Sequence, residues 1–546
     1  MDLDTLLGDP ADPATLFSYA RCAELDRREE FPEEICRELD RLGLPAGYVP
    51  AEYGGTLVDY PRLLDLIRTV ARRDVTVAVG HAKSYLGSVS VWIAGADAQA
   101  RAVAADVIAG VPASWGLTER GHGSDLLAGE VRATRVPGGY RVTGEKWLIN
   151  NATRGSLLSL LARTDPDGGP RGFSLLLIDK RRLAGADYTC LPKVPTHGIR
   201  GADISGIALH GALVPESALI GPEGAGLEVV LKALQLTRTI CAGLSLGAAD
   251  QAIRQAEGFT AERRLYGRLL GEMPHVRRTL GEAHAARFVA EAVTTAAARG
   301  IHALPAEMSV ISAVTKAFVP ARVDELIFAC GELLGTRAFL TEVHDHGVFQ
   351  KLARDHRVVA IFDGNSSVNE NALINQFPVL ARGYLSGPPD RQGLARLLDL
   401  GSAPGRPGHR DLVLASRGGC GLVQGLPDAV AGLSAPGAGR TRPPGHDLGA
   451  VEALARELLD HCDDLHAALA TCAPSPRDVP AEAFALAQRY QWCFAGAAVL
   501  QLWLANPGWR DRIWPEAALT YVLARLGSDP DRAVFDRLFD ETRERA

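Results

Sequence analysis

The sequence predicts a mainly α-helical protein with one β domain in the middle of the chain, an α+β arrangement. The first observation is that residues 14–110 place apolar side chains at helical spacing. The second is that residues 113–215 alternate apolar and polar side chains and contain a Pro-Gly-Gly turn, which indicates a hairpin. Helical periodicity then returns over residues 226–375 and again over 448–546.

These changes of pattern divide the chain into four predicted regions. We expect an N-terminal helical domain at 1–112, a central β domain at 113–222, a helical domain at 223–385 and an appended, mostly helical region at 386–546. In the last region, residues 434–447 are rich in Gly, Pro and Arg, which is typical of a linker or long loop. A chain of 546 residues is also too long for a single hydrophobic core.

Composition favours a globular cytoplasmic protein. The chain is 47% hydrophobic and 23% charged, and its net charge of -7 argues against nucleic acid as a partner. Nine cysteines without a CxxC pair predict reduced thiols in a cytosolic protein. The N-terminus lacks a basic segment followed by an apolar one, so we expect no signal peptide. No apolar run is predicted to reach the length of a membrane span, and residues 493–505 are predicted to form a buried helix.

Two further motifs carry little functional weight. The segment GGCGLVQG at 418–425 is glycine-rich, but it lacks the spacing of a dinucleotide or Walker-type phosphate loop. The segment HDH at 344–346, with Glu342 nearby, offers two histidines, which is more typical of a solvated loop than of a metal site. We therefore predict no metal centre.

The segment LTERGHGSD, residues 117–125, suits a polar ligand. It places small residues and two hydroxyl groups at the end of a predicted strand. Such a loop lets backbone N–H groups and hydroxyls approach a polar ring edge or a pyrophosphate. A plain glycine-rich turn with an Asx cap is the alternative at this point.

Eight segments in fixed order resemble the acyl-CoA dehydrogenase family of flavoenzymes over residues 15–380. They are AEYGG (51–55), WGLTERGHGSDL (115–126), GEKWLINNA (144–152), GIRGADIS (198–205), VPESALIGPEGAG (214–226), LTRTICAG (236–243), AERRLYGRLL (261–270) and RDHRVVAIFDGNSS (354–367). The resemblance implies an N-terminal helical domain, a middle β-barrel or sandwich and a C-terminal four-helix bundle. The region after 385 is similar to the extra C-terminal region of larger family members only in its position in the chain and in its helical residue pattern.

The resemblance also implies FAD as the cofactor. Carried over to this chain, contacts to the flavin and its phosphate fall on Leu117, Thr118, Gly123 and Ser124. In GEKWLINN, residues Leu148 and Asn150 occupy the places of the usual aromatic residue and of the Thr or Ser that reaches flavin N5, while Trp147 should face the other side of the strand. Asn150 could donate a hydrogen bond as a hydroxyl would.

A second group of residues implied by the resemblance lies later in the chain. Arg263 matches the arginine that reaches across a dimer interface to the FAD pyrophosphate, a task that suits a guanidinium fork. Tyr266 replaces the usual Phe, and Pro274 stands where a cofactor-contacting Gln is common. Asn365 is placed at the cofactor.

Asp363 is the candidate base. The family commonly has Glu at this point, and Asp is one methylene shorter, about 1.5 Å. Some members place the base just before the arginine of LTRT, but here that residue is Thr237, so Thr237 and Arg238 are assigned to substrate contact instead. Nitroalkane oxidases, a side branch of the family, use Asp. The alternative is that Asp363 caps a helix starting near Ser366.

Glu370, seven residues after the candidate base, is a less favoured substitute for it. The resemblance implies FAD-dependent α,β-dehydrogenation of an acyl thioester, on CoA or an acyl-carrier protein, in fatty acid or secondary metabolism. An electron-transferring flavoprotein is the implied acceptor, and a homodimer or homotetramer the implied assembly. Two alternatives stay open: a flavin oxidase or monooxygenase on the same fold, and a catalytically silent flavin-binding or scaffold subunit.

Overall fold

The computed structural model describes residues 3–434, 448–475, 478–506 and 513–545. Nearly all of the predicted linker at 434–447 lies outside these residues. The chain forms two compact units, residues 1–237 and 238–546, and the boundary falls inside the long helix α7 (Gly226–Glu262). The predicted division into four domains is finer than this and stays a prediction.

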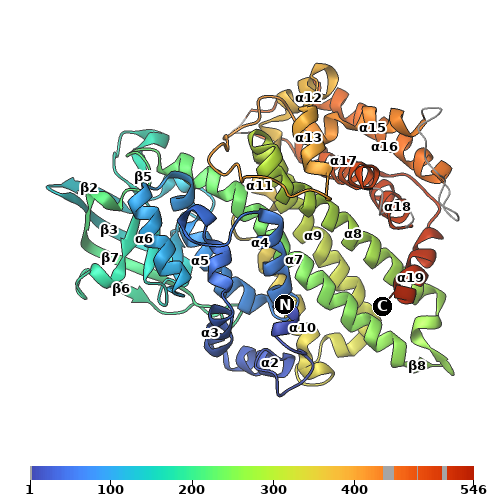
Figure 1. The fold of residues 1–546 in the computed structure, drawn as a ribbon, viewed down its shortest axis with the longest axis horizontal. Helices are drawn as coiled ribbons and strands as arrows, with labels where there is room; N and C mark the ends of the chain where they lie inside the picture. Colours follow the sequence, from blue (N-terminus) through green and yellow to red (C-terminus); the bar gives the residue numbers. More distant parts are fainter. Residues whose placement is uncertain (1–2, 435–447, 476–477, 507–512, 546) are drawn as a thin grey trace. The chain divides into compact units, whose positions relative to one another are not determined.

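The N-terminal unit begins with six helices, of which α5 is the longest. They are α1 (Leu3–Leu6), α2 (Tyr19–Arg28), α3 (Glu33–Arg41), α4 (Tyr60–Ala71), α5 (Val75–Ala94) and α6 (Asp97–Ile108) (Figure 1). Ser18, Asp59 and Asp74 cap α2, α4 and α5 by accepting a backbone N–H. The long helical pattern around residue 30 is in fact two helices, because Glu29 turns left-handed and Pro32 precedes α3.

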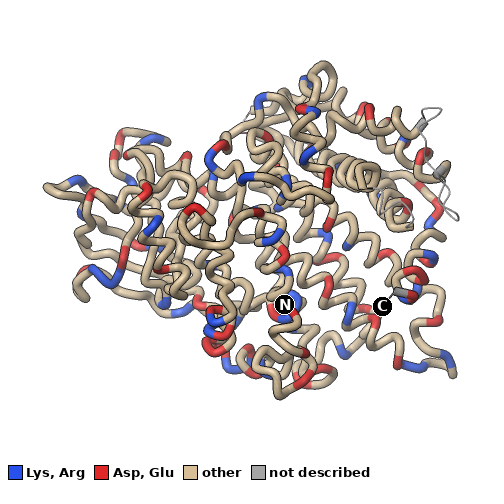
Figure 2. The backbone as a smooth tube through the Cα atoms, viewed as in Figure 1, with Lys and Arg blue, Asp and Glu red and all other residues tan. Residues whose placement is uncertain are grey.

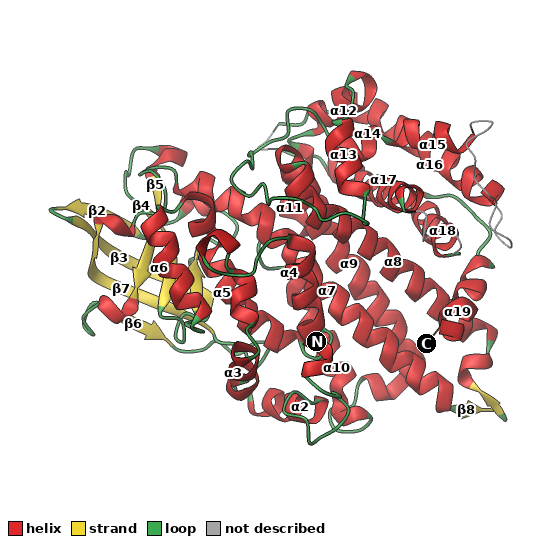
Figure 3. Ribbon diagram, viewed as in Figure 1, coloured by secondary structure: helices red, strands yellow, loops and turns green. Residues whose placement is uncertain are grey.

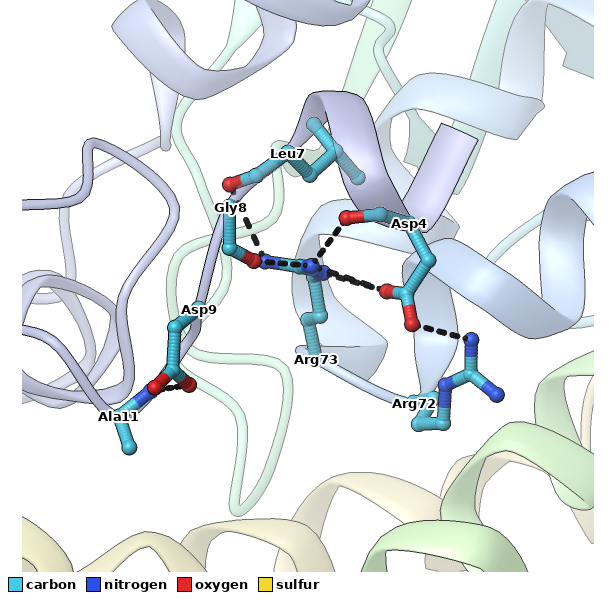
Figure 4. A network of polar contacts seen from close by, with 7 residues as sticks. All are labelled: Asp4, Leu7, Gly8, Asp9, Ala11, Arg72 and Arg73. Carbon is cyan, nitrogen blue, oxygen red and sulfur yellow. Dashed lines mark hydrogen bonds and ion pairs between the residues drawn. The ribbon is translucent and has the colours of Figure 1, made fainter. Parts of the chain in front are cut away.

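A buried arginine anchors the short first helix (Figure 4). The guanidinium of Arg73 donates to the backbone oxygen of Asp4 and to its Oδ1, both at 2.9 Å, and to the carbonyl oxygens of Leu7 and Gly8. Arg72 donates to the other carboxylate oxygen of Asp4 at 2.9 Å. Residues more than 60 positions apart are thereby joined within one unit.

A seven-stranded mixed sheet follows in the same unit (Figure 3). Its strands are β1 (Ala113–Gly116), β2 (Arg132–Val136), β3 (Gly139–Asn150), β4 (Leu157–Arg163), β5 (Phe173–Asp179), β6 (Tyr188–Leu191) and β7 (Ile204–Pro215). The order is β1-β4-β2-β3-β7-β6, with β5 paired to β4. The predicted hairpin is β2–β3, closed by Pro137 and Gly138, and Gly138 has a φ of 82° that favours glycine. The sheet encloses a core of buried Val, Ile, Leu and Ala around Tyr140.

The C-terminal unit is helical apart from one small hairpin. Its strands are β8 (Arg264–Leu265) and β9 (Arg268–Leu269), and its helices after α7 are α8 (Pro274–Ala303), α9 (Met308–Leu334), α10 (Val348–His356), α11 (Ser366–Ile374), α12 (Phe377–Ser386), α13 (Arg391–Leu398), α14 (Gly421–Gln424), α15 (Leu426–Ser434), α16 (Leu448–Thr471), α17 (Ala481–Ala505), α18 (Trp514–Leu526) and α19 (Val534–Arg545). The hairpin is a short β element within residues 226–375, where only helical periodicity was expected. Tyr266 and Gly267 both have positive φ, as a two-residue hairpin turn requires.

The appended helices pack directly on the helices of residues 223–385. Helices α17, α18 and α19 lie against α8, and α17 also lies against α11 (Figure 1). Arg278 of α8 pairs with Asp536 of α19, and Arg525 of α18 pairs with Glu325 of α9. Residues 493–503 are buried, as predicted. Acidic and basic residues are interspersed along the backbone of both units (Figure 2).

One prediction about apolar segments is wrong. Within the described residues, α7 is long and apolar enough, by length and composition, to cross a membrane. Since 83% of its most apolar window is buried inside the structure, this pattern is that of a core helix and is weak evidence for a span.

Candidate active site

The loop after β1 is tied to strand β3. The ammonium group of Lys146 donates to the carbonyl oxygen of Leu117 at 3.0 Å. The backbone N–H of Trp147 donates to the carbonyl oxygen of Thr118, also at 3.0 Å. Beyond these anchors the loop is exposed at Gly123 and Ser124, and the space beside the Gly123 Cα is open. The structure therefore brings Leu117 and Thr118 to strand β3 and leaves the glycine-rich tip accessible to a ligand.

A buried ion pair holds the base of this loop. Lys146 Nζ lies 2.7 Å from Glu119 Oε1, and the backbone N–H groups of Glu130 and Val131 also donate to the Glu119 carboxylate. Burial alone would raise the pKa of Glu119, but the Lys146 charge and these hydrogen bonds outweigh burial and hold it below its ordinary value. Burial lowers the pKa of Lys146. Sequence reasoning missed this pair.

The end of β3 departs from regular strand geometry. Between Trp147 and Ile149 the pairing with β7 shifts register, so Leu148 is an extra residue in a bulge. Leu148 has a φ of 55°, which is unfavourable for a leucine, and its side chain is 40% exposed. Simple alternation therefore does not fix which way Trp147 and Leu148 face. Non-glycine residues held in this region cluster at functional sites.

Asn150 offers one unsatisfied atom. Its amide nitrogen donates to the carbonyl oxygen of Val79 in α5 at 3.1 Å, so one N–H is already used. Its amide oxygen is buried and has no hydrogen-bond partner among the described residues. An unpaired buried polar atom is costly, and this oxygen is open to a hydrogen-bond donor.

Asp363 lies in a left-handed turn within the C-terminal unit. Asp363 and Gly364 have φ values of 55° and 93°. Arg238 Nε donates to the carbonyl oxygen of Asp363 at 3.1 Å, and Lys316 Nζ donates to that of Gly364 at 2.9 Å. The amide of Asn369 donates to the Gly364 oxygen as well, at 2.9 Å. Backbone carbonyls on both residues of the turn are thus held from outside it.

The carboxylate of Asp363 is half-buried in cationic surroundings. Cys241 Sγ lies 3.8 Å from Asp363 Oδ2. Burial lowers the pKa of Arg238 to about 10, and the charge of Asp363 opposes that shift. Burial likewise lowers the pKa of Lys316 to about 8, with Cys241 and Asp363 opposing it. Two buried cations from different helices therefore lie beside this carboxylate.

The helix cap after the turn is Asn365. Its side-chain oxygen accepts the backbone N–H of Val368 at 2.9 Å, and α11 starts at Ser366. The alternative that Asp363 caps this helix is therefore wrong. Since the Asn365 oxygen serves the cap, its role at the cofactor stays a prediction.

The other candidates in the region have structural partners. Glu370 is buried, and Gln491 of α17 donates to its carboxylate at 3.3 Å. Thr237 is fully buried, and its hydroxyl donates to the Leu234 carbonyl of its own helix at 3.5 Å. Arg238 contacts the Asp363 backbone, as described above, so the structure brings these two predicted residues together. Their proposed contacts with substrate stay predictions.

The later group of residues implied by the resemblance lies at and beside the β8–β9 hairpin. Arg263 is exposed, and Tyr266, at the turn, is 98% exposed. Pro274 is the first residue of α8, a position that suits proline.

The two motifs of little weight have structural accounts. In the glycine-rich segment, the N–H of Gly421 donates to the buried Glu307 carboxylate at 2.7 Å. The segment 344–346 is a run of positive-φ residues, and within the described ranges no group of three or more His, Cys, Asp or Glu is placed to hold a metal.

Comparison with known proteins establishes the class. Models of the N-terminal, middle and C-terminal domains of acyl-CoA dehydrogenases match residues 18–111, 114–211 and 224–376. The chain belongs to the acyl-CoA dehydrogenase family, and it is an oxidoreductase enzyme of a flavoprotein family. Acyl-CoA is the typical substrate of this family.

One relative by sequence and two solved structures are similar to this chain. A probable acyl-CoA dehydrogenase of Mycobacterium tuberculosis, FadE25, is 28% identical over 351 residues, which is 63% of this chain and 87% of FadE25. The structure of butyryl-CoA dehydrogenase from Megasphaera elsdenii is 21% identical, covers 64% of this chain and 90% of its own, and has a TM-score of 0.60. The structure of the prolyl acyl carrier protein oxidase AnaB is 18% identical, covers 64% of this chain and 91% of its own, and has a TM-score of 0.58. These two structures share the fold.

Proposed function

We propose that this chain catalyses FAD-dependent α,β-dehydrogenation of an acyl thioester carried by CoA or by an acyl-carrier protein, with Asp363 removing the α-proton. The observation that supports this most is the Asp363 turn. Its carboxylate does not cap α11, because Asn365 does so, and the buried Arg238 and Lys316 hold the backbone of the turn from two helices. A carboxylate that is not used as a helix cap and whose backbone is held in place suits a general base.

The N-terminal unit offers groups that fit FAD. The buried Asn150 oxygen is an unpaired acceptor, and the exposed tip at Gly123 and Ser124 leaves room for a close approach. We propose that Leu117, Thr118 and Asn150 hold the ring system and that Gly123 and Ser124 hold phosphate. When bound, FAD supplies the hydride acceptor.

An anaerobic titration tests this proposal. The purified protein is loaded with FAD and mixed with acyl-CoA thioesters of short, medium and long chain, and with acyl-carrier-protein thioesters. We expect loss of the visible flavin absorption with at least one of them, and an enoyl thioester as the product. A protein that binds FAD but is reduced by none of these thioesters would contradict the proposed reaction.

A flavin oxidase on the same fold is the second candidate, and the aspartate favours it. Asp363 stands where the family commonly has Glu, and Leu148 occupies the place of the usual aromatic residue in a strained bulge. The same titration separates the two reactions, since an oxidase regains its yellow colour rapidly when air is admitted. A dehydrogenase recovers slowly and passes electrons to an electron-transferring flavoprotein.

We also propose a cytoplasmic homodimer or homotetramer. Tyr266, Phe339 and Val343 are exposed apolar side chains, and Arg263 on the same hairpin as Tyr266 is exposed as well. A second copy of the chain would cover such side chains and receive the arginine. All nine cysteines are free thiols, which supports a reducing compartment.

A further inference from the structure

Lys316 is a buried lysine in an unusual position. It lies in the middle of α9 with no exposed surface, between the apolar residues of that helix. Its ammonium group donates to the carbonyl oxygen of Gly364 at 2.9 Å and lies 5.6 Å from the ring centre of Phe362. Lys316 therefore reaches the residues on both sides of Asp363.

A second buried cation holds the same turn from another helix. Arg238 of α7 donates to the carbonyl oxygen of Asp363, and its guanidinium would lie 3.0 Å from a Cβ added at Gly364. The two cations bind consecutive carbonyl groups of a backbone whose φ values are 55° and 93°. Such left-handed backbone persists only where the surroundings enforce it.

We propose that Lys316 is a positioning residue for the base: together with Arg238 it fixes the turn at Asp363 and Gly364 and so aims the Asp363 carboxylate. This inference rests on the proposed function of Asp363. A base must lie in one geometry relative to the proton that it removes, and a displacement of about 1 Å can cost roughly a hundredfold in rate. Lys316 touches the backbone of the turn and acts through Asp363.

Stability does not explain this lysine. Burial lowers its pKa to about 8, so below that pH the folded protein keeps a charge that is more favourably solvated in the unfolded chain. This unfavourable contribution is present below pH 8 and disappears as the pH rises toward the ordinary lysine value. The groups that face Lys316 are Cys241, Asp363 and Arg238, of which the first two favour its charge and the third opposes it.

A pH dependence follows from this arrangement. As the pH rises through about 8, Lys316 becomes neutral and its hydrogen bond to Gly364 weakens. Arg238 keeps its charge to a higher pH, because its pKa is about 10. We therefore expect the turn to loosen, and flavin reduction to slow, as the pH rises through 8.

The variant Lys316→Met tests the role, with Arg299→Met as the matched control. Arg299 is also a buried cation that donates to backbone carbonyls, those of Leu397 at 2.7 Å and Arg396 at 2.8 Å, but it holds residues 396–402. Hydrogen–deuterium exchange is followed for peptides covering 358–366 and 396–402. Lys316→Met should accelerate exchange only in 358–366, and Arg299→Met only in 396–402.

Kinetics supply the second readout. We expect Lys316→Met to keep its FAD and its KM for thioester, to lose roughly tenfold to a hundredfold in flavin-reduction rate, and to lose the fall in rate near pH 8. Unchanged exchange in 358–366 together with an unchanged pH profile would overturn the inference. If no thioester reduces even the unaltered protein, the proposed function fails, while the exchange data still decide whether Lys316 holds the turn.

The unaltered protein keeps the inference testable if Lys316→Met does not fold. Its exchange is measured between pH 7 and 9 and corrected for intrinsic rates, with peptide 396–402 as the internal reference because a guanidinium, and not an ammonium group, binds its backbone carbonyls. Protection of 358–366 should fall relative to the reference above pH 8. Constant relative protection across this range would refute the role of Lys316.

Discussion

Replacing Asp363 by asparagine separates catalysis from structure at the proposed base. Asparagine tolerates the φ of 55° found at this position, and the backbone carbonyl that Arg238 binds is unchanged. The α11 cap is also unchanged, since Asn365 provides it. What is lost is the carboxylate that would take the proton. We expect flavin reduction by thioester to fall roughly 10²- to 10⁴-fold.

The expected stability change is small by comparison. The lost rate corresponds to about 3–5 kcal/mol in activation free energy. The lost charge is half-exposed, and its contact with the side chain of Cys241 is a long one at 3.8 Å. The carboxylate also favours the charged forms of the buried Arg238 and Lys316, so we expect the free energy of unfolding to fall by about 1–2 kcal/mol, less than the loss in activation free energy.

Asn365→Ala is the matched control for this variant. It removes the hydrogen bond to the Val368 N–H, so it should cost about 1 kcal/mol of stability and leave the carboxylate in place. Both variants are loaded with FAD, mixed anaerobically with thioester in a stopped-flow instrument and followed at the visible flavin band. A normal rate in Asp363→Asn would refute the assignment of the base, and Glu370 would be the next residue to test.

Three further variants test other parts of the structure. Arg263→Ala should leave the thermal midpoint nearly unchanged but lower FAD retention and shift the assembly toward monomer in light scattering; a monomer that retains FAD would contradict the proposed dimer. Lys146→Met leaves the buried Glu119 carboxylate without its cation and should lower the free energy of unfolding, measured with denaturant, by about 3–5 kcal/mol. The double variant with Glu119→Gln should regain part of this loss. An unchanged unfolding midpoint in Lys146→Met would contradict the buried pair. Burial raises the pKa of Glu307 to about 7, so its contribution to stability is present at low pH and is lost as the pH rises through 7. Glu307→Gln can still accept the Gly421 N–H, and its thermal midpoint should exceed that of the unaltered protein at pH 8 but not at pH 4.

Local patterns were sufficient to predict much of the fold. Alternation and a Pro-Gly-Gly turn give the β2–β3 hairpin, and apolar spacing gives the long helices. The misses arise where single residues override periodicity. Pro32 divides a continuous helical pattern, and the Tyr266–Gly267 turn inserts a hairpin between α7 and α8. The bulge at Leu148 adds a residue to β3 and so breaks the alternation that would assign a face to Trp147.

The residues around the base were harder to predict, because they come from distant parts of the chain. Arg238 is 125 positions from Asp363, and Lys316 is 48 positions from Gly364. A signal was nevertheless present for two of the missed lysines. Lys316 is a charged residue within an otherwise apolar helical run. Lys146 lies an even number of residues after Tyr140 and Val142 in β3, so alternation places it on the same buried face as these two residues. A charge at a core position requires a partner, so such residues are worth assigning even when the partner is unknown.

The appended region bears on the site through the helix that follows the base. Gln491 of α17 donates to Glu370 of α11, and α17 lies along α11 over much of its length. The cap of α11, Asn365, is two residues from Asp363, so a shift of α11 would move the turn directly. Lys316 and Arg238 hold the turn from α9 and α7, and α17 packs against α9 as well. The region from 386 onward therefore supports two of the three helices that position Asp363, which gives it a structural role at the proposed base.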